Sequence, residues 1–139
     1  VFVDALMGED GKTTMELQSP PIRDALNAST SNGNGTDVIA PFRAEDWGVT
    51  EPALAARMNA MMDPHPAKTF ETRMSLKGRP GNSLPSVYIR CTDPVVPNLV
   101  YFHDMARGLG MRMIDLHTGH LLMSTHPGLL AGTLLELAN

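Results

Sequence analysis

Short apolar runs along the chain predict β-strands. The first run, residues 1–6, is apolar except for Asp4, which is typical of a strand buried on both faces of a parallel sheet. A second run at 87–91 is rich in β-branched and aromatic residues, and a third at 111–116 alternates between apolar and polar side chains. We therefore expect three strands at these places.

Apolar residues at helical spacing predict three helices. The first has Thr50 as its N-cap and ends near residue 62, the second covers 99–106, and the third follows Pro127. The polar stretch 27–36 has no such spacing and predicts a loop. From residue 86 onward, strands alternate with helices, which predicts a parallel sheet with helices on its faces.

Two polar residues follow strands of this predicted sheet. Asp93 comes after the strand that ends near Cys91, and His120 comes after the strand that ends near Leu116. In such sheets, function is found beyond the carboxyl ends of the strands. A carboxylate beside an imidazole fixes the tautomer of the ring and stabilises the imidazolium that forms when it takes a proton. The two residues are thus a candidate acid–base pair, although either could instead cap a loop.

Several segments, in this order, resemble the second half of an α/β-hydrolase. Residues 1–6 resemble the strand that follows the nucleophile helix, 88–93 (Tyr-Ile-Arg-Cys-Thr-Asp) the strand that delivers the triad acid, and 115–123 the catalytic-histidine loop. Residues 47–52 and 62–70 look like the cap of the branch that contains hydroxynitrile lyases, plant methyl-ester esterases and bacterial esterases.

This resemblance implies a fold and a domain organisation. The fold would be the C-terminal half of an α/β-hydrolase, with a parallel sheet flanked by helices and a small helical cap. Residues 1–12 would form a core strand, 13–78 the cap or lid, and 79–139 the C-terminal part of the hydrolase core.

The resemblance also implies the roles of a Ser-His-Asp triad. His120 matches the general base and Asp93 the acid, in the chain order of this fold. Asp4, at the end of the preceding strand, is the alternative acid. The serine elbow G-x-S-x-G of the family is absent, because Gly81-Asn82-Ser83-Leu84-Pro85 lacks its last glycine and precedes a strand. We expect the nucleophile in an N-terminal half of the same fold, and no activity from this chain alone.

The residue after His120 bears on the reaction. Cyanohydrin-cleaving members of the family carry lysine there, whereas this chain has Leu121, so carboxylester hydrolysis is favoured. A carbon–carbon lyase of the hydroxynitrile lyase type and a non-catalytic ligand-binding module remain the alternatives. Five apolar residues are candidates to line a pocket for a small hydrophobic ester: Trp47, Met58, Met61, Met62 and Leu121.

The remaining histidines and the cysteine suggest no further chemistry. His117 and His120 flank a Thr-Gly pair that would break a helix, so we expect no metal site and no cofactor. His65 and His103 are expected to be surface or capping residues. Cys91 lies inside a predicted strand and is expected to be a small buried side chain.

Composition limits the partners. The 139 residues carry 11 basic and 15 acidic side chains, and a net charge of −4 with scattered signs argues against a nucleic-acid surface. No 18-residue apolar run indicates a membrane span. Expected partners are a small ester, the N-terminal half of the fold and a second copy of the chain. The chain shows neither an initiator methionine nor a signal peptide, so we expect about half of one domain, from a cytoplasmic protein.

Overall fold

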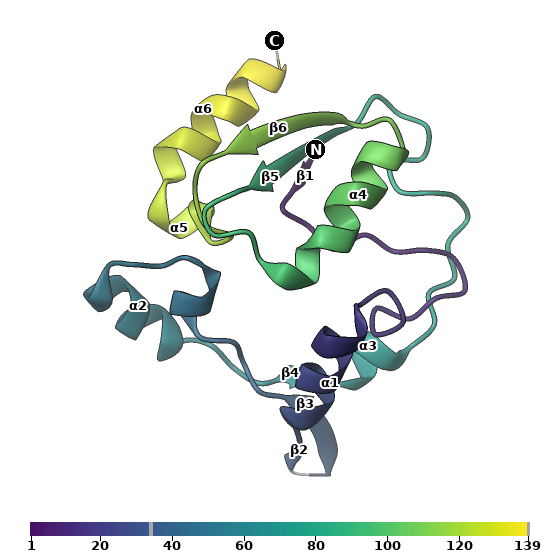
Figure 1. Cartoon of the computed structure of the whole chain (residues 1–139), viewed down its shortest axis with the longest axis vertical. Helices are drawn as coiled ribbons and strands as arrows, with labels where there is room; N and C mark the ends of the chain where they lie inside the picture. Colours follow the sequence, from purple (N-terminus) through teal and green to yellow (C-terminus); the bar gives the residue numbers. More distant parts are fainter. Residues whose placement is uncertain (34, 139) are drawn as a thin grey trace.

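A computed structural model gives the structure of the protein and describes residues 1–33 and 35–138. Figure 1 shows two parts. The upper part contains a parallel sheet with helices beside it, and the lower part contains short helices around a small antiparallel sheet. The chain begins in the upper part, passes through the lower part and returns to complete the sheet.

The parallel sheet has the strand order β1-β5-β6. Its strands are β1 (Phe2–Val3), β5 (Val87–Cys91) and β6 (Arg112–Leu116), and both pairings are parallel. The predicted strands at 87–91 and 111–116 are confirmed. The first strand is shorter than predicted, because the backbone turns at Asp4, whose φ is +42°. β1 lies at an edge of this sheet and, among the described strands, pairs only with β5.

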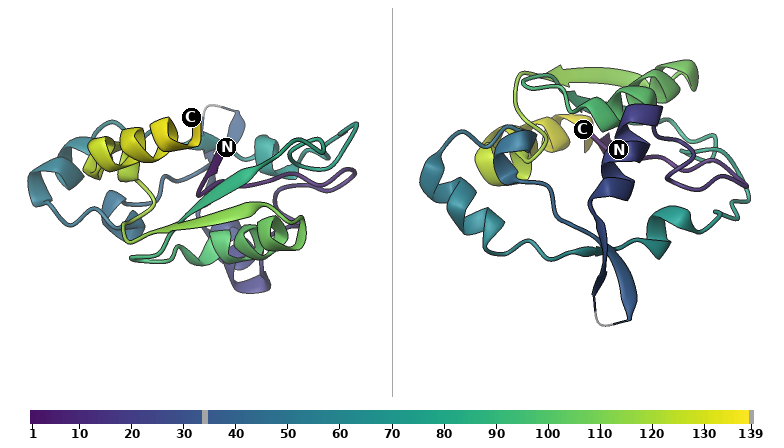
Figure 2. Two further views of the ribbon diagram at one scale, coloured as in Figure 1. Left: turned by 90° about the horizontal axis from the view of Figure 1, so that it is seen from above. Right: turned by 60° about the horizontal axis from the view of Figure 1, so that its bottom comes forward.

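Helices lie on both sides of this sheet. α4 (Val100–Gly108) follows a 3-10 turn, η2 (Pro97–Leu99), and connects β5 to β6. The chain ends with α5 (Leu122–Thr125) and α6 (Pro127–Ala138). Figure 2 (left) shows α4 on one side of the sheet and α6 on the other. The predicted helices at 99–106 and after Pro127 are therefore confirmed, but α6 buries none of its residues.

The lower part is built from short elements. Its helices are α1 (Pro20–Ala28), η1 (Ala44–Trp47), α2 (Pro52–Asn59) and α3 (Lys68–Glu71), and its antiparallel sheet consists of β2 (Thr30–Gly33), β3 (Thr36–Ile39) and β4 (His65–Pro66). The predicted helix near 50–62 is confirmed as α2. However, its N-cap is Glu51 and not Thr50, because the Glu51 carboxylate accepts the N–H groups of Ala53 and Leu54.

The prediction of a loop over 27–36 was wrong. This stretch contains the end of α1 and most of a hairpin between β2 and β3, while Asn34 lies outside the described residues. The side-chain hydroxyls of Ser29 and Thr30 donate to the Leu26 carbonyl and close the helix. Main-chain pairing then holds the hairpin together. Such contacts need no apolar periodicity, so the sequence pattern gave no sign of them.

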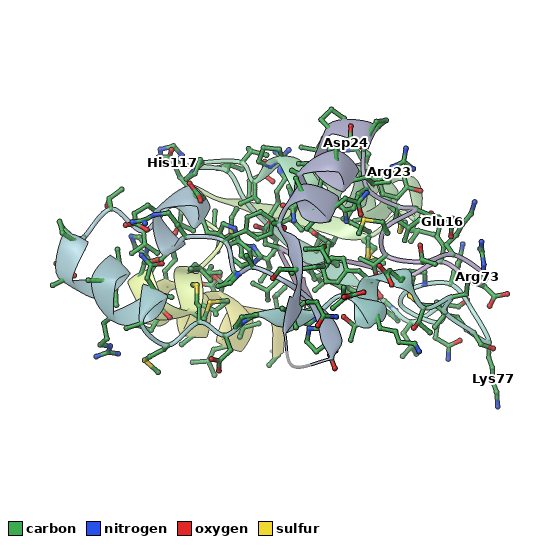
Figure 3. All side chains as sticks on the ribbon, turned by 90° about the horizontal axis from the view of Figure 1, so that it is seen from below. Glu16, Arg23, Asp24, Arg73, Lys77 and His117 are labelled. Carbon is green, nitrogen blue, oxygen red and sulfur yellow. The ribbon has the colours of Figure 1, made fainter. Side chains whose placement is uncertain are left out.

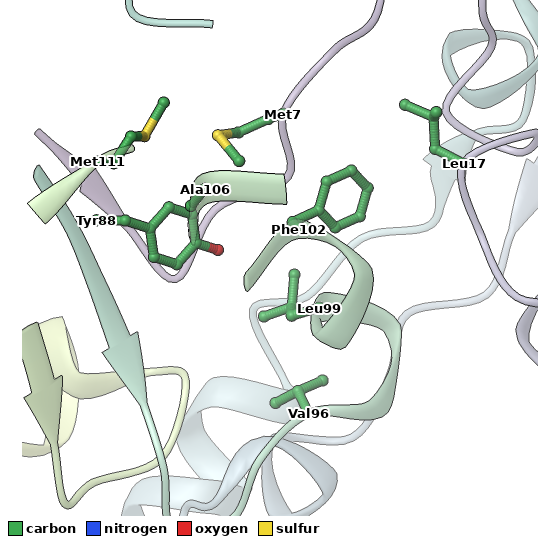
Figure 4. Close-up of a cluster of buried hydrophobic side chains, with 8 residues drawn as sticks. All are labelled: Met7, Leu17, Tyr88, Val96, Leu99, Phe102, Ala106 and Met111. Atoms are coloured by element: carbon green, nitrogen blue, oxygen red, sulfur yellow. The ribbon is translucent and has the colours of Figure 1, made fainter. Parts of the chain in front are cut away.

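The largest core cluster gathers around α4 and reaches from Tyr88 of β5 to Leu17, on the segment after β1 (Figure 4). It contains Met7, Leu17, Tyr88, Val96, Leu99, Phe102, Ala106 and Met111. The Tyr88 hydroxyl donates to the Ala5 carbonyl at 2.8 Å, which fixes the backbone just beyond Asp4. Burial of each large side chain of this kind contributes roughly 1.5–3 kcal/mol. The core therefore holds the carboxyl end of β1 against β5 and α4.

Surface ion pairs add a second connection between distant segments. Arg73 donates to both carboxylate oxygens of Glu16 and to the Gly11 carbonyl, and Figure 3 shows Glu16 and Arg73 near one another at the surface.

No helix in the described part of the chain is long and apolar enough to cross a bilayer. The boundaries predicted at residues 12 and 78 stay a prediction.

Candidate active site

The structure brings Asp4 and His120 together at the carboxyl edge of the parallel sheet. Asp4 follows β1 and His120 follows β6, and these strands end on the same side because the sheet is parallel. The distance from His120 Nδ1 to Asp4 Oδ2 is 2.9 Å. The Asp4 side chain is 1% exposed and that of His120 18%. The pair thus combines a fully buried carboxylate with an imidazole that still reaches the surface.

Asp4 accepts hydrogen bonds from three groups. His120 binds Oδ2, whereas His103 Nε2 (2.9 Å) and the backbone N–H of Cys91 (3.2 Å) bind Oδ1. An ionised carboxylate can only accept, so both imidazole nitrogens must carry a proton. In its neutral form, His120 is therefore protonated on Nδ1 and has a lone pair on Nε2. This is the tautomer that a general base needs.

These contacts determine the charge of Asp4. Burial by itself would raise the pKa of the Asp4 carboxyl group. The hydrogen bonds from His103, from His120 and from the Cys91 backbone outweigh burial and lower the pKa to about 2. Asp4 is therefore ionised at neutral pH, and a negative charge lies beside the His120 ring.

The backbone of Asp4 is strained in a way that serves this geometry. Its φ of +42° lies in the left-handed region, which costs an L-residue roughly 1–2 kcal/mol. Asp4 N still donates to the Ile89 carbonyl at 2.7 Å, so the turn begins directly where the pairing with β5 stops. The strain and the hydrogen bonds together point the carboxylate toward α4 and the loop after β6.

Asp93, the acid favoured from the sequence, does not contact His120. Its carboxylate lies 3.2 Å from His117 Nε2, and both side chains are exposed, at 62% and 83%; Figure 3 shows His117 at the surface. The Asp93 N–H donates to the Thr118 carbonyl, so the backbone here joins the two loops after β5 and β6. That pairing turns the side chain outward, and the contact expected for Asp93 is made by the alternative, Asp4.

His103 was expected at the surface or in a cap, and this expectation was wrong. It is 3% exposed and lies on the buried side of α4 with Phe102 and Ala106. Its ring contacts Tyr88 edge to face, with centroids 5.6 Å apart. The spacing of His103 from the apolar Leu99 and Ala106 already placed it on the inward face of the helix. That was the signal in the sequence that could have found it.

Trp47 covers the other side of His120. The indole meets the imidazole edge to face, with centroids 4.6 Å apart and planes at 85°. Two glycines bring the chain this close, because a Cβ at Gly119 would lie 2.6 Å from the Trp47 carbonyl and 2.8 Å from Gly48 Cα. Gly48 also has a φ of +88°, which ends η1. The loop after β6 therefore depends on glycine to hold Trp47 against the histidine.

An apolar pocket of about 580 Å³ opens beside Trp47. Its wall contains seven large apolar residues, namely Leu6, Leu26, Ile39, Phe42, Trp47, Met62 and Phe70. Two residues predicted to line a pocket, Trp47 and Met62, lie here. Met58 and Leu121 pack instead against a small cluster around Val49, and Met61 is 74% exposed.

No described side chain hydrogen-bonds to His120 Nε2, the atom that would act on a nucleophile. Ser83 precedes β5, so it lies beyond the amino end of this strand, whereas His120 lies at the carboxyl edge of the sheet. Ser83 lines a different pocket, near residues 79–86.

Cys91 is fully buried, as predicted, and burial, together with the charge of Asp4, raises the pKa of its thiol to about 12. It is therefore a protonated core residue at neutral pH.

The described residues also contain no group of three or more His, Cys, Asp or Glu side chains placed to hold a metal ion. His117 binds Asp93, and His126 Nδ1 lies near the Thr118 and Thr125 hydroxyls, so these histidines have local partners.

Comparisons with known proteins identify the fold. No protein-family model and no curated protein matches the chain. Among solved structures, it is similar to an extracellular α/β-hydrolase from a Paenibacillus species, described as sharing structural and functional homology with tobacco salicylic acid binding protein 2. The TM-score is 0.79 at 22% identity, over 97% of this chain and 59% of that chain. The chain thus has the fold of the C-terminal part of an α/β-hydrolase, as predicted.

Proposed function

We propose that the protein is a carboxylesterase in which His120 is the general base and Asp4 its acid partner. The observation that carries the proposal is the 2.9 Å hydrogen bond from His120 Nδ1 to the buried Asp4 carboxylate. It leaves Nε2 of His120 without a hydrogen bond to any described side chain, at the edge of the sheet where α/β enzymes place their active sites. The α/β-hydrolase fold of the structural neighbour supports the same conclusion.

In this proposal, a serine from an N-terminal half of the fold supplies the nucleophile. His120 Nε2 takes the hydroxyl proton as the serine attacks the ester carbonyl, and Asp4 stabilises the imidazolium. His120 then returns the proton to the leaving alcohol, and water releases the acid by the same steps. Two facts support a second half: the chain spans 59% of its neighbour, and β1 has one pairing edge unused among the described strands.

The surroundings of His120 favour a small hydrophobic or aromatic ester. Trp47 touches the imidazole and also forms part of the wall of the apolar pocket, so a substrate reaching the histidine would contact both. Leu121 packs against the cluster around Val49 and places no cation beside His120. Ester hydrolysis is therefore favoured over the release of cyanide, which a neighbouring cation would help.

The test compares three variants of the full gene product, meaning the polypeptide of which these 139 residues are all or part. With p-nitrophenyl butyrate as substrate, His120→Ala and Asp4→Asn should each lower kcat/KM by ~10³- to 10⁴-fold, because triad members act as a unit. Asp93→Asn should stay within about threefold of wild type, since exposed ion pairs of this kind contribute little.

Other outcomes have distinct meanings. A large loss in Asp93→Asn with none in Asp4→Asn would return the acid role to Asp93. Unchanged turnover in His120→Ala would refute the esterase proposal. Cyanide release from mandelonitrile would favour the lyase alternative, and saturable ester binding without turnover in wild type would indicate a binding protein.

A further inference from the structure

A second histidine holds the carboxylate on which His120 depends. His103 lies on α4, is 3% exposed, and its only hydrogen bond among the described residues is to Asp4 Oδ1 at 2.9 Å. Burying an imidazole costs free energy unless its polar atoms are bonded. The fold therefore keeps a hydrogen-bonded histidine at a core position where an apolar side chain could be buried at a lower cost in free energy.

The two oxygens of Asp4 are used by different partners. Oδ1 accepts from His103 Nε2–H and, at 3.2 Å, from the Cys91 backbone N–H, whereas His120 is the only described residue that binds Oδ2. A carboxylate fixed at one oxygen by two donors cannot rotate about its Cβ–Cγ bond without breaking both bonds. His103 thereby determines the direction in which Oδ2 presents itself to His120.

The ring of His103 is itself fixed. Tyr88 packs edge to face against it at 5.6 Å, and the Tyr88 hydroxyl donates to the Ala5 carbonyl directly after Asp4. β1, β5 and α4 each therefore supply one part of the arrangement. It joins the core of the protein to the acid of the candidate dyad.

We propose that His103 is a positioning residue that orients Asp4 for His120, so that removing its Nε2–H donor weakens catalysis without changing substrate binding. This inference rests on the proposed function. His103 lies behind Asp4, on the opposite carboxylate oxygen from His120, and acts only through that carboxylate. It is not a catalytic residue, since the contact that it makes is with Asp4 and not with a reacting atom.

Three variants of the full gene product test this role. His103→Phe keeps a ring in the core but removes the donor, whereas His103→Gln places an amide N–H close to the position of Nε2. Phe102→Leu is the matched control, because Phe102 is the adjacent, fully buried residue on α4 and belongs to the core cluster instead of the Asp4 network.

With p-nitrophenyl butyrate, His103→Phe should lower kcat by about 10- to 100-fold, the loss expected for one hydrogen bond to a charged group. KM should change by less than about twofold, because the interactions that bind substrate and transition state equally are left intact. His103→Gln should recover kcat to within about fivefold of wild type. Phe102→Leu should lower the melting temperature and leave kcat unchanged. If His103→Phe loses no more kcat than Phe102→Leu, or if His103→Gln rescues nothing, the positioning role is refuted.

A measurement that needs no turnover separates this inference from the esterase proposal. In ¹⁵N-histidine-labelled protein, two-bond ¹H–¹⁵N correlations report the tautomer of each ring. Wild type should show His103 protonated at Nε2 and His120 at Nδ1. In His103→Phe, the His120 signal should move toward a mixture of tautomers, and His103→Gln should restore it. An unchanged His120 tautomer in His103→Phe would overturn the positioning role, even if the protein hydrolyses no ester.

Discussion

At the scale of single residues, the candidate site depends on one carboxylate in an apolar strand. Asp4 is surrounded by Phe2, Val3 and Ala5 in sequence, and is 1% exposed in the structure. A buried charge of this kind is retained only with donors around it, and three donors are present. Asp93 has the opposite character, since its exposed carboxylate is solvated and needs no partner.

The burial of Asp4 predicts an acid-dependent contribution to stability. Its pKa is lowered from 3.8 to about 2 in the folded protein, so the stabilisation is fully present above pH 4 and is lost as the pH falls through 2. The shift corresponds to about 2 kcal/mol. In urea unfolding of the full gene product, wild type should exceed Asp4→Asn in free energy of unfolding at pH 6, and the difference should shrink by about this amount toward pH 2.

Asp115→Asn is the control for this titration. Its carboxylate also has a lowered pKa, from the hydrogen bond with Arg90, but it lies at the surface. At neutral pH, Asp115→Asn should lower the free energy of unfolding by far less than Asp4→Asn does, because exposed ion pairs contribute little. A difference between wild type and Asp4→Asn that stays constant from pH 6 to pH 2 would contradict the assigned charge of Asp4.

At the scale of elements, the loop after β6 and the turn η1 are held together by glycine. A Cβ added to either Gly119 or Gly48 would lie 2.8 Å from the Cα of the other glycine, so backbone atoms face each other across this contact. Such atoms move only if a whole segment moves. The position of Trp47 over His120 thus depends on backbone packing rather than on the indole side chain alone.

Gly119→Ala should therefore separate η1 from the loop that carries His120. The added methyl group would meet the Trp47 carbonyl at 2.6 Å, and overpacking of this kind costs roughly 1–3 kcal/mol. Because Trp47 is the only tryptophan among the 139 residues, a change in its environment should be visible in the fluorescence that this residue contributes. We expect its emission to shift to longer wavelength as solvent reaches the indole.

Gly128→Ala is the matched control for this substitution. A Cβ at Gly128 meets nothing within 4 Å, and the residue lies in α6, where alanine has the higher helix propensity. Its stability and emission should equal or slightly exceed those of wild type. If Gly119→Ala behaves like Gly128→Ala in both measurements, the contact between η1 and the loop does not position Trp47.

At the scale of the whole molecule, apolar surface lies open along β1 and α6. Val1 is 64% exposed beside the edge of β1 that pairs with no described strand, and Leu129 and Leu134 of α6 are 45% and 37% exposed. A strand edge and a helix with no buried residue are features that a further layer of structure would cover. The structural neighbour, of which this chain matches 59%, has more chain to supply such a layer.

The 139 residues expressed alone should accordingly associate or unfold without cooperativity. Light scattering should show mass above that of a monomer, and the thermal transition should be broad or irreversible. Leu129→Glu should reduce the association, because it places a charge on the open face of α6, whereas Ala131→Glu, at another exposed position of the same helix, should reduce it less. A sharp, reversible transition at monomer mass would contradict this expectation, and a defined dimer would show that a second copy covers the face.

The sequence by itself determined the elements of the upper part. The runs at 87–91 and 111–116, and the helices around them, follow from local side-chain spacing, which reflects which faces are buried. The sequence pattern also placed His120 in the loop after the last strand, and the alternation of strands and helices predicted that this loop lies at the carboxyl edge of the sheet.

Only the tertiary structure decided which acid His120 contacts and that His103 joins them. Asp4 is separated from His120 by 116 positions, and the direction of its carboxylate depends on a single positive φ. The exposure of Asp93 depends on main-chain bonds between two loops. Periodicity reports burial and says nothing about such long-range, backbone-determined contacts. For that reason, the sequence kept Asp93 and Asp4 as alternatives, and the fold alone distinguished them.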